Sequence, residues 1–207
     1  KSEISYKDGK LVDHPMLDTD EVTGEKWVGS YKDGVPDGNW TGWDENGLQS
    51  SEGNFIDGTG NFSFYIGNQK RFELSYKDGA GKETKWNESG QKLEEANYKD
   101  GALVYRTQFK YFNNGQIDSE NNYKDGKLNG KSTFWYKNGQ KFSEGNYKDD
   151  KPDGKWTFWK KNGQKIEEVN YKDGDLVDKT IFKYSYFTGH LKSEKKYKDG
   201  KCISGDC

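Results

Sequence analysis

A glutamate that recurs about every 24 residues is the most regular candidate for chemistry in this sequence. Carboxylates can act as general acids or hold a cation, but equivalent residues on neighbouring β-hairpins would lie about 10 Å apart, two strand spacings. That separation is too large for two carboxylates to share a proton or a bare cation. We therefore expect each glutamate to bond to the backbone or to a lysine or threonine of its own hairpin; an acidic stripe facing a basic partner is the alternative. The glutamates are Glu52, Glu73, Glu95, Glu120, Glu144, Glu168 and Glu194.

The other polar residues supply no catalytic set. Nucleophilic catalysis needs a base beside the nucleophile, and His14 and His190 stand in no such arrangement; His190 takes the turn position that holds Gln140 and Gln164 in other repeats. The aspartates of a recurring Lys-Asp-Gly phrase lack the dense alternating carboxylates of a calcium loop and are expected to form turns. The sequence predicts no catalytic residue, no metal site, no cofactor and no enzymatic activity. These aspartates are Asp33, Asp78, Asp100, Asp125, Asp173 and Asp199.

Two cysteines, Cys202 and Cys207, lie five residues apart at the C-terminal end of the sequence. They could form a small disulfide loop, which would imply an oxidising compartment, or remain two thiols on a frayed end. With no histidine or further cysteine nearby, they make a poor metal site.

Aromatic side chains are the remaining candidates for a functional surface. The chain has 7 Trp, 14 Tyr and 11 Phe. Ring packing over a sheet is their ordinary role, but rings left exposed on a single layer would mark a binding surface. The predicted partner face comprises Trp40, Trp43, Trp86, Tyr111, Trp135, Trp156 and Trp159.

A repeat in the sequence predicts the strands and turns that position these residues. The phrase Tyr-Lys-Asp, with a Phe-Ile-Asp variant at Phe55, recurs at intervals of about 21 to 26 residues. Asn-Gly pairs between alternating runs predict hairpins with type I′ turns, in which both central residues have positive φ. The second turn, Lys-Asp-Gly-x-x-x-Gly, reads as longer. The phrase begins at Tyr6, Tyr31, Tyr76, Tyr98, Tyr123, Tyr147, Tyr171 and Tyr197, and the Asn-Gly pairs are at 46–47, 114–115, 138–139 and 162–163.

This spacing excludes helices, because turn residues arrive every 10 to 12 positions. It predicts an all-β fold, an elongated single-layer twisted antiparallel meander of tandem hairpins, held together by rings rather than by a buried interior. We expect an N-terminal strand and irregular cap at 1–30, repeats at 31–197 and a C-terminal cap at 198–207. A two-residue turn at 162–163 would place Thr157 opposite Glu168 and Trp159 opposite Ile166, with Trp156 on the other face.

The bulk composition agrees with a thin sheet and excludes several partners. Only 29% of residues are hydrophobic and 33% are charged, with a net charge of −2. Because the two signs are interspersed, no basic face for nucleic acid is visible, and anionic membrane lipid is not favoured. There is no run of 18 apolar residues that would cross a membrane as a helix.

The repeat pattern resembles the bacterial MORN repeat variant family, some members of which are labelled YwqK-type antitoxins. Residues 31–54 follow the pattern through Tyr31, Gly34, Gly38, Trp40, Trp43, Asn46, Gly47 and Glu52. Residues 147–170 follow it through Tyr147, Gly154, Trp156, Trp159, Asn162, Gly163 and Glu168, with Asp150 in place of a glycine. Residues 55–75 and 76–97 are short in the first turn, and 10–25 depart from the pattern.

We expect a non-enzymatic scaffold that binds a protein partner through an extended aromatic and charged face. The alternatives are a carbohydrate- or choline-type ligand binder at a cell surface and, by the resemblance, a cytoplasmic antitoxin-like protein. The start at Lys1, the paired cysteines and the polar repeats favour a secreted or surface location, with the cytoplasm as the alternative. The partner's identity and the oligomeric state are not encoded in any motif.

Overall fold

The computed structural model describes residues 6–7, 10–11, 15–19 and 25–205, with side chains described from Glu25 onwards. All regular structure in these residues is β-strand. The chain forms two compact units, Lys1–Arg106 and Thr107–Cys207, called here the N-terminal and C-terminal units. Strand β11 (Ala102–Tyr111) contains the boundary between them.

The strands of the N-terminal unit are β1 (Tyr6–Lys7), β2 (Lys10–Leu11), β3 (Pro15–Thr19), β4 (Lys26–Lys32), β5 (Val35–Trp43), β6 (Gln49–Ile56), β7 (Thr59–Ile66), β8 (Gln69–Lys77), β9 (Ala80–Trp86) and β10 (Lys92–Lys99). Those of the C-terminal unit, after β11, are β12 (Ile117–Lys124), β13 (Lys127–Trp135), β14 (Lys141–Lys148), β15 (Lys151–Trp159), β16 (Lys165–Lys172), β17 (Asp175–Tyr184), β18 (Leu191–Lys198) and β19 (Lys201–Ser204). The segment 1–30, expected to be a strand and a cap, contains β1 to β3 and the start of β4.

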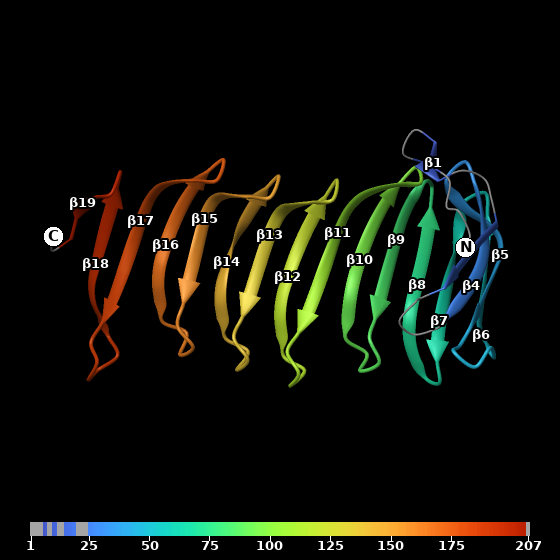
Figure 1. Ribbon diagram of the computed structural model, residues 1–207, viewed down its shortest axis with the longest axis horizontal. Helices are drawn as coiled ribbons and strands as arrows, with labels where there is room; N and C mark the ends of the chain where they lie inside the picture. Colours follow the sequence, from blue (N-terminus) through green and yellow to red (C-terminus); the bar gives the residue numbers. More distant parts are fainter. Residues whose placement is uncertain (1–5, 8–9, 12–14, 20–24, 206–207) are drawn as a thin grey trace. The chain divides into compact units, whose positions relative to one another are not determined.

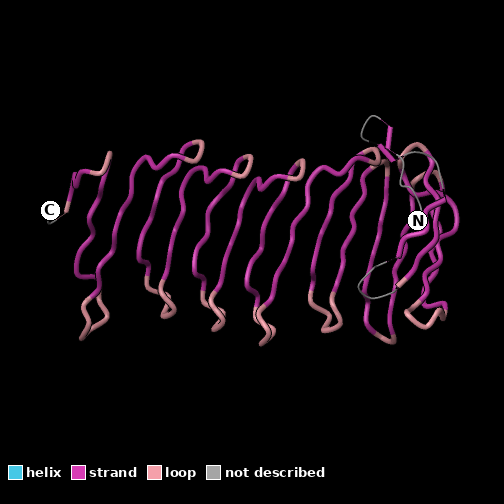
Figure 2. Tube along the Cα trace, viewed as in Figure 1, coloured by secondary structure: helices cyan, strands magenta, loops and turns pink. Residues whose placement is uncertain are grey.

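Each strand from β12 to β19 pairs antiparallel with the next, and so does each strand from β3 to β10. Figure 1 shows β12 to β18 side by side in one layer, and Figure 2 shows the turns gathered at the two ends of the strands. The predicted antiparallel meander of hairpin repeats is therefore confirmed. Cys202 lies in β19, whereas Cys207 lies outside the described residues, so the bond between them stays a prediction.

The Lys-Asp-Gly turns are the tight ones, contrary to the sequence prediction. Lys32 pairs with Val35 across a loop of only Asp33 and Gly34, and both loop residues have positive φ, 53° and 80°. These are the backbone angles of a type I′ turn, whose twist matches that of the flanking strands. The aspartate tolerates the left-handed conformation better than most residues, which explains its recurrence.

The Asn-Gly turns have one residue more than predicted. At Asn162-Gly163 only the glycine has positive φ, and Gly163 N donates to Lys160 O at 2.9 Å. This is a type I turn followed by a left-handed glycine, a three-residue hairpin loop. The extra residue produces a bulge in the ladder, so Trp159 stands opposite Lys165 rather than Ile166, while Thr157 still faces Glu168 as predicted.

Side-chain amides link the Asn-Gly turns of neighbouring repeats in the C-terminal unit. Each amide donates to a main-chain carbonyl in the turn of the next repeat, about one repeat length further along the chain. We call these the turn-to-turn amide bonds: Asn114 Nδ2 to Lys137 O (2.9 Å), Asn138 Nδ2 to Lys161 O (2.8 Å) and Gln164 Nε2 to Gly189 O (2.8 Å).

The N-terminal unit does have a buried interior, and here the expectation of a sheet without one is wrong. Trp27 on β4 and Phe72 on β8 stack with ring centroids 5.3 Å apart, although four strand spacings would separate these strands by about 19 Å in a flat sheet. The sheet of this unit is therefore curled. The core that it encloses consists of Trp27, Trp40, Phe55, Phe62, Phe64, Phe72, Leu74 and Tyr76.

Glycines let the buried indoles approach the neighbouring strand. A Cβ at Gly29 on β4 would stand 2.2 Å from the ring of Trp40 on β5, and a Cβ at Gly145 on β14 would stand 2.2 Å from the ring of Trp156 on β15. Only a residue without a side chain leaves room for the ring at these positions. The same arrangement therefore recurs in both units.

Candidate functional site

One face of the sheet carries a row in which glutamate and threonine alternate from strand to strand. In the C-terminal unit Glu120 faces Thr133, Thr133 faces Glu144, Glu144 faces Thr157 and Thr157 faces Glu168. We call this the glutamate face. The predicted pairing of the glutamates within their own hairpins has a direct structural basis here.

Two lysines hold each of three recurring glutamates, two in the C-terminal unit and one in the N-terminal unit. Lys141 Nζ, three residues earlier on the same strand, lies 2.6 Å from Glu144 Oε2, and Lys131 Nζ on the neighbouring strand lies 3.2 Å from the same oxygen. Lys82 and Lys92 hold Glu95 in the same way, as Lys155 and Lys165 hold Glu168. These three carboxylates are therefore held by ion pairs of their own hairpins.

The lysines lower the pKa of the glutamates that they contact. For Glu144 the hydrogen bond from Lys141 lowers the pKa, partial burial opposes it, and Lys131 adds to the lowering. For Glu168 partial burial raises the pKa, but the hydrogen bonds from Lys155 and Lys165 outweigh it and the net direction is downward. The charged form is thus favoured in the folded state.

Replacing both Glu144 and Glu168 with glutamine should lower the free energy of unfolding by about 1 kcal/mol or less at pH 7, because these ion pairs are partly exposed and screened by solvent. Since the folded-state pKa values are depressed, the pairs stabilise the fold above the unfolded-state pKa and this contribution is lost as the pH falls through the folded-state pKa. Urea unfolding between pH 7 and acid should show the two proteins converging. Glu45→Gln, at an exposed turn position, is the control, and a gap that widens in acid would contradict the assignment.

The rings of the glutamate face lie beneath the protein's own cations. Lys141 Nζ stands 5.9 Å from the ring centroid of Trp159, and Lys70 Nζ stands 5.8 Å from that of Trp86. A lysine over an indole is an attractive cation–π arrangement. These ring faces are therefore already engaged.

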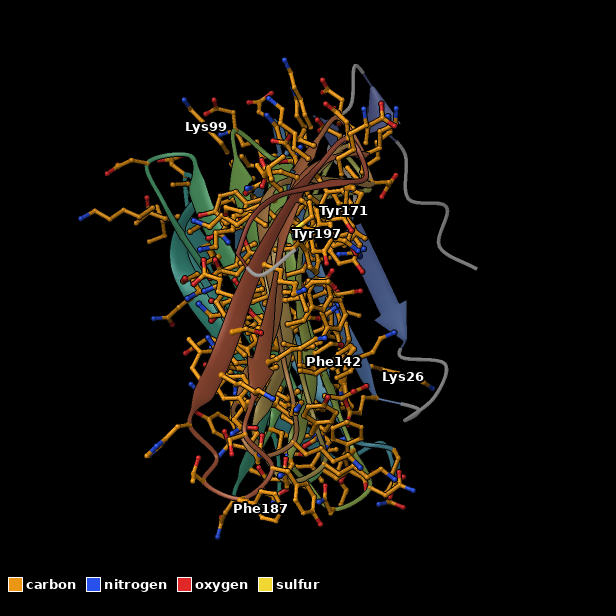
Figure 3. All side chains as sticks on the ribbon, turned by 90° about the vertical axis from the view of Figure 1, so that its left-hand side faces the viewer. Lys26, Lys99, Phe142, Tyr171, Phe187 and Tyr197 are labelled. Carbon is orange, nitrogen blue, oxygen red and sulfur yellow. The ribbon has the colours of Figure 1, made fainter. Side chains whose placement is uncertain are left out.

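The opposite face of the C-terminal unit carries an aromatic groove with a volume of about 300 Å³. Two of its ring pairs meet edge to face: the centroids of Tyr147 and Trp156 lie 5.0 Å apart at 78°, and those of Phe142 and Phe158 lie 6.4 Å apart at 72°. Trp156 lies nearly parallel to Phe134 and Phe158, at 27° and 26°. Figure 3 shows Phe142 and Tyr171 projecting from the sheet. The groove is lined by Phe134, Phe142, Ser143, Tyr147, Pro152, Trp156, Phe158 and Tyr171.

The buried indole of Trp156 forms the floor of the groove, and strand pairing sets the position of Phe142 beside it. Trp156 is 5% exposed, and its indole Nε1 donates to Asn146 O at 3.0 Å, so its polar atom is satisfied within the sheet. Phe142 is 43% exposed and occupies the extra position of the bulge created by the three-residue turn. The groove thus has a rigid indole at its base and accessible rings around it.

The predicted partner face does not form one surface. Trp40 is fully buried and Trp156 nearly so, whereas Trp159 lies with Glu168 and Lys165 on the glutamate face. Trp43, Trp86, Tyr111 and Trp135 are half-buried. Because residues three positions apart in a strand point to opposite faces, the Trp-x-x-Trp spacing divides the tryptophans between the two sides.

Of the groove residues, Trp156 alone belongs to the predicted partner face. The others were not predicted as a surface: Phe134, Phe142, Ser143, Tyr147, Pro152, Phe158 and Tyr171. A signal for them was present, because strand alternation places Phe158 on the face of Trp156. The position of Phe142 could not be derived in the same way, since it depends on the bulge that the unexpected turn introduces. Tyr186 and Phe187, exposed at the β17–β18 turn, form a separate ring pair with centroids 5.6 Å apart. Figure 3 labels Phe187.

Two kinds of site are not found among the residues that the structure describes. No three His, Cys, Asp or Glu side chains gather in a way that could hold a metal ion. No helix with the length and apolarity to cross a membrane is present in that part of the chain.

Comparison with known proteins identifies the repeat. The MORN repeat variant matches residues 81–100, 107–125, 128–149 and 152–173, and no curated protein matches the chain. Among solved structures the chain is similar to a porin-like protein from Bacteroides uniformis, with 10% identity over 91% of this chain and 92% of that one; the TM-score of 0.23 is too low to carry an argument. The matched segments coincide with the hairpins β9–β10, β11–β12, β13–β14 and β15–β16. The chain therefore carries four repeats of the MORN variant family between residues 81 and 173.

Proposed function

We propose that this protein is a non-enzymatic repeat scaffold that binds a partner protein through the aromatic groove of its C-terminal unit. The observation that carries the proposal is the groove itself, with accessible rings arranged around a rigid indole. Aromatic residues in such a setting provide most of the binding energy at protein interfaces.

The lining of the groove indicates the chemistry of the partner segment. None of the eight lining residues is charged, and seven of them are aromatic or proline. An uncharged, apolar segment in extended conformation would fit, because the lining offers ring surfaces and no charge to pair with. Proline-rich segments dock in aromatic-lined grooves of this kind, and the hydroxyls of Tyr147 and Tyr171 could donate to their carbonyl groups.

A site-specific cross-linker tests the proposal in cells of the source organism. A photoreactive phenylalanine at position 142 should capture a partner protein, and mass spectrometry should locate the cross-link in an uncharged, extended segment of it. The purified partner should then lose at least tenfold in affinity for Phe142→Ser/Phe158→Ser, since truncating one anchor ring typically costs about 2 kcal/mol. Both rings are partly exposed, so this variant is expected to fold.

Trp159→Ser, on the glutamate face, is the matched control and should leave the affinity unchanged. Unchanged affinity in the Phe142→Ser/Phe158→Ser variant, or loss only in Trp159→Ser, would contradict the assignment of this face. A choline- or glycan-binding function instead requires open ring faces. Lysines cover several rings of the glutamate face, so titration with choline should leave the Trp fluorescence unchanged.

A further inference from the structure

One repeat of the N-terminal unit carries a buried arginine at a position that varies between the repeats. Two positions before the recurring glutamate, the repeat of β7–β8 has Arg71, whereas the others have Ser50, Leu93, Asp118, Phe142, Ile166 and Lys192. Like Phe142, Arg71 falls at the bulge that follows its turn. Arg71 is only 7% exposed, which is unusual for a charged residue in a sheet with so much accessible surface.

The buried guanidinium lies against two carboxylates. Arg71 Nε is 3.4 Å from Glu25 Oε1, and both side chains are 6% exposed. Arg71 Nη2 is 3.9 Å from Oε1 of the exposed Glu88. The Nε–H nevertheless donates no hydrogen bond within the protein, although buried donors are almost always satisfied. The arginine therefore keeps donor capacity at a buried site.

These charges line a cavity of about 390 Å³, at the lower end of the range for small-molecule sites. Its base is formed by buried residues, Glu25, Arg71 and the stacked rings of Trp27 and Phe72. Its rim is accessible and includes Glu88 and Ser89 in the β9–β10 turn. The complete lining is Glu25, Trp27, Arg71, Phe72, Lys85, Trp86, Asn87, Glu88, Ser89 and Leu93.

We propose that this cavity binds a small zwitterion with an apolar body, of the class of the aromatic and large aliphatic α-amino acids. The lining offers the Arg71 guanidinium for a negative charge and the carboxylates of Glu25 and Glu88 for a positive one. Lys85 also lies in the lining but pairs with Glu83, 3.1 Å away. The ligand carboxylate accepts from the Arg71 guanidinium and its ammonium group donates to Glu25 or Glu88. Its apolar body packs against the rings of Trp27 and Phe72.

Calorimetric titration of the whole protein with L-phenylalanine tests this proposal. We expect one site with a Kd of about 1 mM or tighter. Phenethylamine, which lacks the carboxylate, and 3-phenylpropionate, which lacks the ammonium group, should each bind at least tenfold more weakly. Equal binding of either analogue, or of uncharged N-acetylphenylalaninamide, would overturn the zwitterion assignment. No heat of binding up to about 10 mM for L-phenylalanine, L-tryptophan and L-leucine would overturn the site itself.

Two variants test whether L-phenylalanine binds at this cavity. Glu25→Leu/Arg71→Leu replaces both members of the buried ion pair with apolar residues, a change that is often neutral for stability, so it should fold and should bind L-phenylalanine at least tenfold more weakly. Phe142→Ser/Phe158→Ser, in the C-terminal unit, should bind it as the wild type does. If the folded Glu25→Leu/Arg71→Leu variant bound L-phenylalanine as tightly as the wild type, the proposal would be wrong. Partner binding at the aromatic groove is measured separately, so either proposal can fail without the other.

Discussion

Trp40→Ala is expected to lower the free energy of unfolding of the N-terminal unit by about 3–5 kcal/mol, the usual cost of removing a large buried ring. Trp40 is completely buried, and its indole contacts the rings of Tyr31, Phe55 and Phe62 at centroid distances of 5.3 to 5.9 Å. The cavity left by its removal cannot collapse easily, because the curled sheet supports it from several strands. This loss is a large fraction of the stability of an ordinary domain.

Hydrogen exchange followed by mass spectrometry is the suitable measurement, since it reports each unit separately. Protection should fall across β4 to β8 and remain unchanged in β13 to β16. Trp43→Ala removes a half-buried indole three residues away and is the matched control, with a smaller expected loss. If the two alanine variants destabilise the unit equally, Trp40 is not the centre of its core.

Arg71→Leu is expected to cost about 3–5 kcal/mol, because it leaves the buried carboxylate of Glu25 without its guanidinium. Adding Glu25→Leu should recover most or all of the loss. Replacing both members of a buried ion pair with apolar residues is often neutral or stabilising by about 1–4 kcal/mol. The double variant should therefore be more stable than Arg71→Leu alone.

Chemical unfolding of the wild type, the two single variants and the double variant gives the coupling energy of the pair. A coupling of several kcal/mol is the expected result. Additive losses, with the double variant less stable than either single variant, would show that the two residues do not act as a pair. Lys82→Leu/Glu95→Leu, a partly exposed pair on the glutamate face, is the control and should show a coupling of about 1 kcal/mol or less.

The repeat pattern was sufficient to predict strands, pairing and the glutamate row, because these depend on local spacing. Thr157 faces Glu168 as predicted, because both residues recur once in each repeat and their pairing follows from the repeat spacing. The turns were assigned the wrong way round: both Asn-Gly and Asp-Gly favour positive φ, and only the lengths of the adjoining strands decide which pair forms the two-residue loop. Because of that error, Trp159 was predicted to stand opposite Ile166 when it stands opposite Lys165. The bulge position of Phe142 could not be predicted for the same reason.

The curl of the N-terminal unit could not be predicted from the repeats. It depends on contacts between β4 and β8, such as Trp27 with Phe72, which lie about 45 residues apart and obey no repeat spacing. The short turns in residues 55–97 were visible as departures from the pattern, whereas Arg71 occupies a position that varies between the repeats and did not stand out. Their joint consequence, a cavity with buried charges of both signs, became evident only in three dimensions.

The turn-to-turn amide bonds give the C-terminal unit a directional response to force. Each amide reaches only the next repeat, so a pull on the chain beyond β19 would load the outermost hairpin first and leave the others relaxed until it detaches. Extension would then proceed as a series of small releases, one hairpin at a time, and each turn would lose the amide donor of the repeat before it only when its own hairpin detaches. Under tension such a unit would lose its hairpins one after another, whereas a sheet loaded in shear would lose its strand pairs together.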